Sequence, residues 1–143
     1  CERMTDLKKM IMDHLVQDVF CRLGVSPLHG VGVFAIRPIK KGQNPLRSRA
    51  AFEEVRFSHD EIKVLPRGIR KQIEMFCYYD DEGVLISTMG MNTMDFSIYL
   101  NHSKQPNLRM MRDGGFEALR RIKIGEELTM DYDHSFGAEH HFD

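Results

Sequence analysis

The sequence has no excess charge of either sign and no long apolar run. Its 143 residues contain 20 Lys+Arg and 21 Asp+Glu, which gives a formal net charge of −1. Binding through bulk charge needs a strongly basic surface, so this balance argues against recognition of nucleic acid by electrostatic attraction. No stretch approaches the ~18 apolar residues of a membrane span, and the amino end lacks a signal-peptide profile. We therefore expect a soluble chain with neither a membrane partner nor a sequence-specific nucleic-acid partner.

Cysteine is also scarce. The three cysteines, Cys1, Cys21 and Cys77, are widely spaced and form no CxxC pair. This spacing disfavours a disulfide framework and a cysteine-rich zinc cluster, and it favours an intracellular reducing compartment. The length corresponds to one compact domain. Because the chain begins with Cys1 rather than methionine, we expect a fragment of a longer protein.

Apolar periodicity predicts one amphipathic helix, over residues 4–18, followed by many short strands. A hairpin with a glycine-rich turn is expected over residues 19–35, and Ser58 with Glu61 has the spacing of a helix-capping box. A second short helix is expected from Pro66 to Phe76. The remaining strands are expected at 45–49, 78–79, 84–87, 107–112, 116–122 and 128–132. The predicted fold class is therefore α+β, mainly β with short helices.

Two polar features are ambiguous when each is taken alone. Gly30-Val31-Gly32 is either a tight hairpin turn or bare backbone that a ligand approaches, and it lacks the third glycine of a dinucleotide site. Asn101-His102-Ser103 is either a turn with a satisfied histidine or part of a polar site. Ser103 has no elbow glycines around it, so hydrolase chemistry is a poor interpretation.

Two other groupings have weak support. The histidines near the carboxyl end, at 134, 140 and 141, lack the ligand spacing of a metal site. Cys77 with His102 would make a thiol nucleophile and its base, but no sequence feature brings the two together.

Three stretches that follow one another along the chain change this interpretation: SPLHGVGVFAIRPIKKG, NHSKQPN and IKIGEELTMDYD. In sequence and spacing, they resemble the three motifs of the SET-domain family of protein lysine methyltransferases. The resemblance covers about residues 19–132. It implies small curved β-sheets with a knot-like C-terminal segment, here preceded by a helix. We expect an N-terminal helical extension over 1–18 and a SET catalytic domain over 19–143.

The resemblance also implies an activity. We expect an S-adenosylmethionine-dependent protein lysine N-methyltransferase that acts on a histone tail or another basic lysine-containing peptide, with a nuclear, chromatin-associated location. The alternatives are a SET-like module that binds cofactor or peptide with little turnover, and a methyltransferase for a non-histone protein. The sequence does not predict the target lysine, the number of methyl groups or the oligomeric state.

Site residues are implied motif by motif. Tyr132 is the implied catalytic residue, where the lysine channel meets the methyl group; the other interpretation is a core tyrosine with a bonded hydroxyl. The implied cofactor contacts are His29, Gly30, Val31, Gly32, Asn101, His102, Tyr132 and Phe142. The implied substrate channel is lined by Tyr78, Tyr79, His134 and Phe136. Tyr78 and Tyr79 are neighbours on a strand, so one of the two is expected to face the channel.

The sequence departs from the family pattern at the positions that would bind zinc. Lys104 stands where a cysteine is common, and the tail contains no cysteine. We therefore expect no metal, and we expect residues 133–143 to complete the site instead. Phe142 is a candidate to cover the adenine. His134 occupies a position that is usually Phe or Tyr, and Phe136 is its alternative under a shifted alignment.

Overall fold

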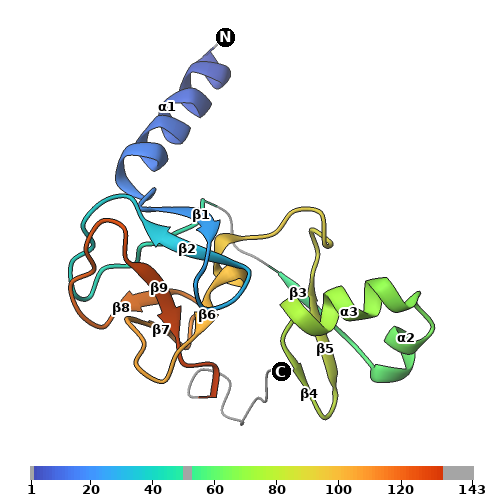
Figure 1. The fold of residues 1–143 in the computed structure, drawn as a ribbon. Helices are drawn as coiled ribbons and strands as arrows, with labels where there is room; N and C mark the ends of the chain where they lie inside the picture. The colour runs from blue at the N-terminus through green and yellow to red at the C-terminus, as the bar shows by residue number, and fades with distance from the viewer. Residues whose placement is uncertain (1, 50–52, 134–143) are drawn as a thin grey trace. The chain divides into compact units, whose positions relative to one another are not determined.

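The computed structural model describes residues 2–49 and 53–133, which divide into two compact units (Figure 1). The first unit holds residues 2–49 and 99–133, and the second holds residues 53–98. Both combine short strands with helices or turns, which confirms the predicted α+β class. Within the described ranges, no helix is both long and apolar enough to cross a membrane.

The N-terminal helix α1 (Glu2–Gln17) confirms the predicted helix to within two residues, and none of its residues is buried. Its C-terminal end is held by Arg37. The guanidinium donates hydrogen bonds to the carbonyl oxygens of Val16 at 2.6 Å and Val19 at 3.3 Å. It also lies over the ring of Phe20, 4.3 Å from the ring centroid. One arginine therefore fixes the point where the helix ends and the first strand begins.

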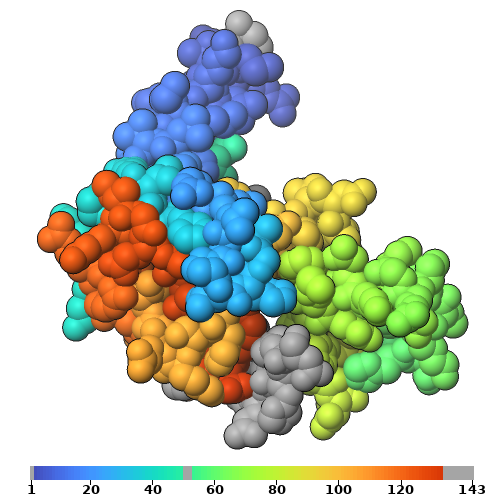
Figure 2. Space-filling model, viewed as in Figure 1, coloured from blue at the N-terminus to red at the C-terminus, as the bar shows by residue number. Residues whose placement is uncertain are grey.

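The sheet of the first unit is built around its last strand. The order is β1-β2-β9-β7-β8, with β6 also paired to β9. Strand β9 is antiparallel to β2 and parallel to both β6 and β7. Figure 2 shows residues near 120–130 beside residues near 30–35 on the surface of this unit. The strands are β1 (Cys21–Val25), β2 (Val31–Ala35), β6 (Asn101–His102), β7 (Leu108–Met110), β8 (Phe116–Ala118) and β9 (Glu127–Met130).

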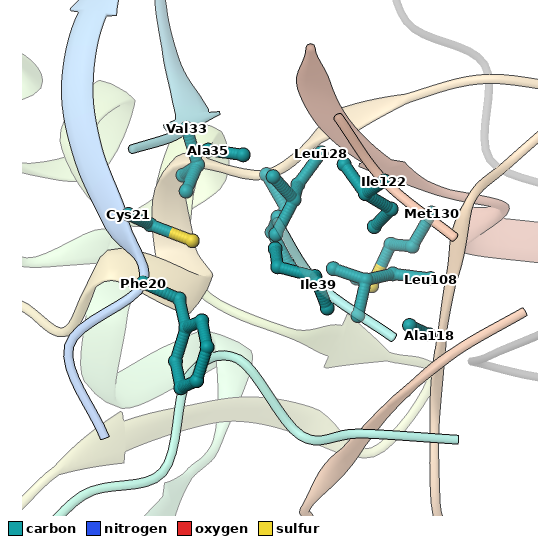
Figure 3. Close-up of a cluster of buried hydrophobic side chains, with 11 residues drawn as sticks. Phe20, Cys21, Val33, Ala35, Ile39, Leu108, Ala118, Ile122, Leu128 and Met130 are labelled. Carbon is teal, nitrogen blue, oxygen red and sulfur yellow. The ribbon is translucent and has the colours of Figure 1, made fainter. Parts of the chain in front are cut away.

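The core of this unit lies against β9 (Figure 3). Its fully buried side chains include Val33, Ile39, Leu108, Ile122 and Leu128. Ile39 and Ile122 also form an isolated antiparallel bridge, which joins two loops across the core. Burial raises the pKa of the Cys21 thiol to about 12, so Cys21 packs as a small apolar residue rather than as a reactive thiolate.

The second unit has its own sheet and its own small core. Its sheet order is β3-β5-β4, and its buried residues are Ile62, Ile73 and Val84. Both halves of the predicted capping box between Ser58 and Glu61 are present. The elements of this unit are β3 (Glu54–Phe57), α2 (His59–Lys63), α3 (Arg67–Phe76), β4 (Tyr79–Asp80) and β5 (Gly83–Ser87). The 3-10 helix η1 (Phe96–Tyr99) leads from it to β6.

The predicted strand at residues 45–49 is wrong. This stretch forms turns and bends, and the Asn44 side chain accepts a hydrogen bond from the Leu46 amide at 3.0 Å. Such local bonds offer the backbone an alternative to a sheet. Strand β3 and the two-residue strand β6 were not predicted from the sequence. Strand β3 is mostly exposed and is identified by its pairing with β5.

Removing the buried side chain of Leu128 should destabilise the first unit. We expect Leu128→Ala to lower the free energy of unfolding by about 2–5 kcal/mol, because it leaves a cavity in the core. Leu28→Ala is the matched control, since that side chain is 57% exposed, and it should change the free energy by less than about 0.5 kcal/mol. Urea unfolding followed by circular dichroism measures both. Equal losses for the two variants would contradict the position of Leu128 in the core.

Candidate functional site

The glycine-rich turn between β1 and β2 is held by its own backbone and by one serine. The Ser26 amide donates to the carbonyl of Gly30 at 2.8 Å, and the Ser26 hydroxyl accepts from the amides of Leu28 at 3.0 Å and His29 at 3.3 Å. Gly30 has a φ of 49°, a conformation that favours glycine. Apart from its chain neighbours, no atom of the described residues lies within 4 Å of the place where its Cβ would be. Among these residues, the turn at His29, Gly30 and Val31 is therefore exposed.

Asn101 joins this turn to the second motif. Its side-chain nitrogen donates to the carbonyl oxygens of His29 at 3.1 Å and Val31 at 3.3 Å, and to Oε2 of Glu127 at 2.8 Å. The three acceptors fix the orientation of the amide, because a flipped amide would place its oxygen against three other oxygens. The Oδ1 oxygen of Asn101 is thus directed away from these three acceptors.

Strand β9 places the third motif beside the second. The parallel pair aligns Asn101 with Thr129 and His102 with Met130. The buried Asn107 side chain holds β9 as well: it accepts from the Thr129 amide at 2.9 Å and donates to the Glu127 carbonyl at 2.8 Å. The two ends of the NHSKQPN stretch therefore both bind the same strand.

Tyr132 follows directly after this strand. Its hydroxyl donates to the carbonyl oxygen of Leu100, and its amide donates to Nδ1 of His102 at 3.1 Å. The rings of His102 and Tyr132 are 5.2 Å apart between centroids. Burial, reinforced by the negative charge of Glu127, raises the pKa of Tyr132 to about 12. At neutral pH the side chain is therefore a neutral phenol that is held from both ends.

Lys104 forms ion pairs with the acidic residues on either side of Tyr132. Its ammonium pairs with Asp133 and lies 3.6 Å from Asp131 Oδ1. The hydrogen bond to Asp133 is the main cause that raises the pKa of Lys104. His102, Asp131 and Asp133 offer ligand atoms within 4.8 Å of one another, the geometry of a small metal site. The Lys104 cation therefore pairs with both carboxylates of this cluster.

The structure brings together the predicted residues of the first unit. The bonds of Asn101 connect the turn at His29 and Val31 to β9, and His102 contacts Tyr132. Tyr78 and Tyr79 belong to the second unit, where Tyr78 is half-buried and Tyr79, on β4, is exposed. The predicted residues His134, Phe136 and Phe142 lie outside the described residues.

The alternative chemistries lose support. The Ser103 amide donates to the Met130 carbonyl at 3.1 Å, and its hydroxyl accepts from the Gln105 amide at 3.0 Å, as expected of a turn residue. Burial is the main cause that raises the pKa of Cys77, and its Sγ lies 3.6 Å from the sulfur of Met91. Both features disfavour a thiolate nucleophile at neutral pH.

Three contributing residues were not predicted as part of the site. Ser26 and Glu127 hold the turn, and Asn107 holds β9. The signal for Asn107 and Glu127 was their place in the quoted motifs, where no role was assigned to them. No local pattern pairs Ser26 with Glu127, because 101 residues separate them.

Comparison with solved structures identifies chains with a similar fold. One is a Plasmodium falciparum protein provisionally assigned as a histone methyltransferase, at 22% identity and a TM-score of 0.51. Two others are Chaetomium thermophilum Polycomb Repressive Complex 2 structures. One is autoinhibited and bound to S-adenosylmethionine, at 24% identity and a TM-score of 0.51; the other is a humanized mutant bound to an inhibitor, at 25% and 0.50.

The extent of these matches differs. The alignments cover 84% of this chain for the Plasmodium protein and 82% for each Polycomb structure. They cover 98% of the Plasmodium chain but 16% and 15% of the two Polycomb chains.

The family model described as SET domain matches residues 30–133, which include the turn from Gly30, Asn101, His102 and Tyr132. The chain therefore belongs to the SET-domain family.

Proposed function

We propose that this chain is an S-adenosylmethionine-dependent protein lysine N-methyltransferase, with residues 19–143 as the catalytic domain and 1–18 as an extension. One observation carries the proposal: the turn, the Asn101-His102 pair and Tyr132 are joined by hydrogen bonds across three separate stretches of the chain. These stretches are the ones that resemble the family motifs, and the family model spans nearly all of them.

The residues of the turn fit the chemistry of the cofactor. The residues that would hold S-adenosylmethionine are His29, Gly30, Val31, Gly32, Asn101 and His102. The Oδ1 atom of Asn101 is an acceptor suited to the ammonium group of the cofactor. The Nδ1 atom of His102 already accepts from Tyr132, so we expect this residue to contact the cofactor through its backbone. Bound S-adenosylmethionine supplies a methyl group on a positively charged sulfur. Phe142 remains a predicted cover for the adenine.

Tyr132 is suited to orient a neutral amine rather than to remove its proton. A tyrosine is protonated at neutral pH, its raised pKa makes ionisation still less favourable, and its proton is donated to Leu100. A phenol oxygen can accept a hydrogen bond from the lysine amine or weak C–H contacts from the methyl group. The gain in rate then comes from alignment and from exclusion of water.

The substrate lysine must lose a proton before it reacts. Its ordinary pKa near 10.4 lies roughly three units above neutral pH, a cost on the order of 4–5 kcal/mol. An apolar channel disfavours the ammonium and so lowers this cost. The proposed channel residues are Tyr78, Tyr79, His134 and Phe136. A dedicated general base is then not required.

The proposed substrate is a lysine in a histone tail, which implies a nuclear, chromatin-associated enzyme. The support is the description of the structural neighbours as a histone methyltransferase and as Polycomb Repressive Complex 2. A net charge of −1 is compatible with a basic peptide and a cationic cofactor. Methylation of a non-histone protein would use the same site. We propose that no metal takes part, since Lys104 pairs with the two carboxylates of the candidate metal cluster.

Removing the hydroxyl of Tyr132 should slow methyl transfer. We expect Tyr132→Phe to lower kcat by about 10²-fold on core histones with radiolabelled S-adenosylmethionine, because the amine loses its orienting contact. Tyr99→Phe is the matched control, since Tyr99 also packs against the core and has no assigned role in the reaction. Equal labelling by wild type and Tyr132→Phe would remove Tyr132 from the mechanism.

The pH dependence separates an orienting role from a base. The folded Tyr132 keeps its proton up to a pKa of about 12, above the ordinary value of about 10. Its contribution to stability is therefore complete below about pH 10 and is lost as the pH rises further. We expect kcat/KM to rise with pH toward the lysine pKa at the same midpoint in wild type and Tyr132→Phe. Loss of that rise in the variant would identify Tyr132 as the base.

Calorimetry distinguishes the enzyme from a module that only binds. We expect S-adenosylmethionine to bind the wild-type chain and the labelling assay to show turnover. Cofactor binding without turnover on any basic protein or peptide would favour the binding module.

A further inference from the structure

The carboxylate of Glu127, on β9, contacts side chains of the glycine-rich turn and is not among the residues proposed to contact the cofactor or the substrate. The Ser26 hydroxyl lies 2.8 Å from each of its two oxygens, and Asn101 Nδ2 donates to Oε2 at 2.8 Å. Hydrogen bonds to a charged acceptor are about twice as strong as neutral ones. This carboxylate therefore fixes two side chains that each hold part of the turn.

Ser26 links the Glu127 carboxylate to the backbone of the turn. Its hydroxyl has one proton, which it donates to Glu127, and its oxygen accepts from the amides of Leu28 and His29. Asn101, the second partner of Glu127, holds the carbonyls of His29 and Val31. Amides and carbonyls of the turn are thus both oriented by side chains that bind one carboxylate.

Gly32 gives independent support for this position of the carboxylate. A Cβ on Gly32 would lie 2.4 Å from Oε2 of Glu127 and 3.0 Å from the Cβ of Ser26. Gly32 is buried, in contrast to Gly30, which has no close neighbour among the described residues beyond those next to it in the chain. The second glycine of the turn therefore leaves the space that the Glu127 carboxylate occupies, whereas the first favours the backbone conformation of the turn.

The adjacent residue, Glu126, has a different environment. Its carboxylate pairs with Arg120 at 2.9 Å and accepts from the Lys123 amide at 2.9 Å, both at the surface. This surface pairing lowers the pKa of Glu126, chiefly through the hydrogen bond from Arg120. Two identical side chains, one residue apart, thus differ in whether they contact the turn.

We propose that Glu127 is a positioning residue, which holds residues 26–32 in the conformation that binds S-adenosylmethionine. The inference rests on the proposed function, because it assigns a role at the same site. The variant Glu127→Gln keeps the size of the side chain but loses one acceptor oxygen. Its remaining carbonyl oxygen can still accept a hydrogen bond from Ser26 or Asn101, whereas its new NH₂ group cannot, so the variant preserves only part of the network. Glu127→Ala removes the network's acceptor altogether.

The test compares Glu127→Ala and Glu127→Gln with Glu126→Ala. We expect Glu127→Ala to raise both the Kd from calorimetry and the KM for S-adenosylmethionine by about ten- to hundredfold. The KM for the peptide should change by less than about threefold, and Glu127→Gln should fall between Ala and wild type. Glu126→Ala should bind as wild type does. A purely structural role would lower stability without this selective effect on the cofactor.

Hydrogen exchange on the protein without cofactor gives a second readout. The amides of Leu28 and His29 should exchange faster in Glu127→Ala and in Ser26→Ala, and the double variant should add little to either. If Glu127→Ala does not fold, Ser26→Ala and Glu127→Gln provide the same comparison.

The outcomes separate the two proposals. Wild-type affinity for the cofactor in both Glu127 variants, or an equal loss in Glu126→Ala, would overturn the positioning role and leave the proposed function intact. Absence of cofactor binding by the wild-type chain would overturn the proposed function. In that case unchanged exchange at Leu28 and His29 would also overturn the role of Glu127 in holding the turn.

Discussion

The carboxylate of Glu127 accepts hydrogen bonds from Ser26 and Asn101, and the arrangement of the candidate site depends on this contact. The three residues are distant in sequence, so they meet when β9 pairs with β2 and β6. A buried polar group left without a partner costs about 1–3 kcal/mol. The turn, β6 and β9 therefore stabilise one another, and the backbone that faces a ligand is fixed by folding.

The same strand leads into Tyr132, so one element supports both the glycine-rich turn and the proposed catalytic phenol. Burial and the charge of Glu127 raise the pKa of that phenol, while Leu100 and His102 hold its two ends. Chemistry at such a site depends on alignment and exclusion of water. The ion pairs of Lys104 connect the second motif to the acidic residues on either side of Tyr132.

Much of the fold could be predicted because its signals are local. The N-terminal helix follows from apolar periodicity, the hairpin from its glycines and the helix at Ser58 from its capping box. Strand β6 and the partners of Glu127 could not be found in this way, because they depend on pairing between distant segments. The strand expected at 45–49 failed because a local turn at Asn44 competes with it. The resemblance supplied the remaining site residues, and their roles stay proposals.

We propose that this site transfers a methyl group to a lysine. Incubation of the chain with S-adenosylmethionine and an array of lysine-containing peptides, followed by mass spectrometry of each peptide, is the decisive test of this activity. We expect methyl groups on the ε-amine of a defined lysine, and we expect them to be abolished when that lysine is replaced by arginine. Tight cofactor binding with no methylated peptide, or methylation at residues other than lysine, would contradict it.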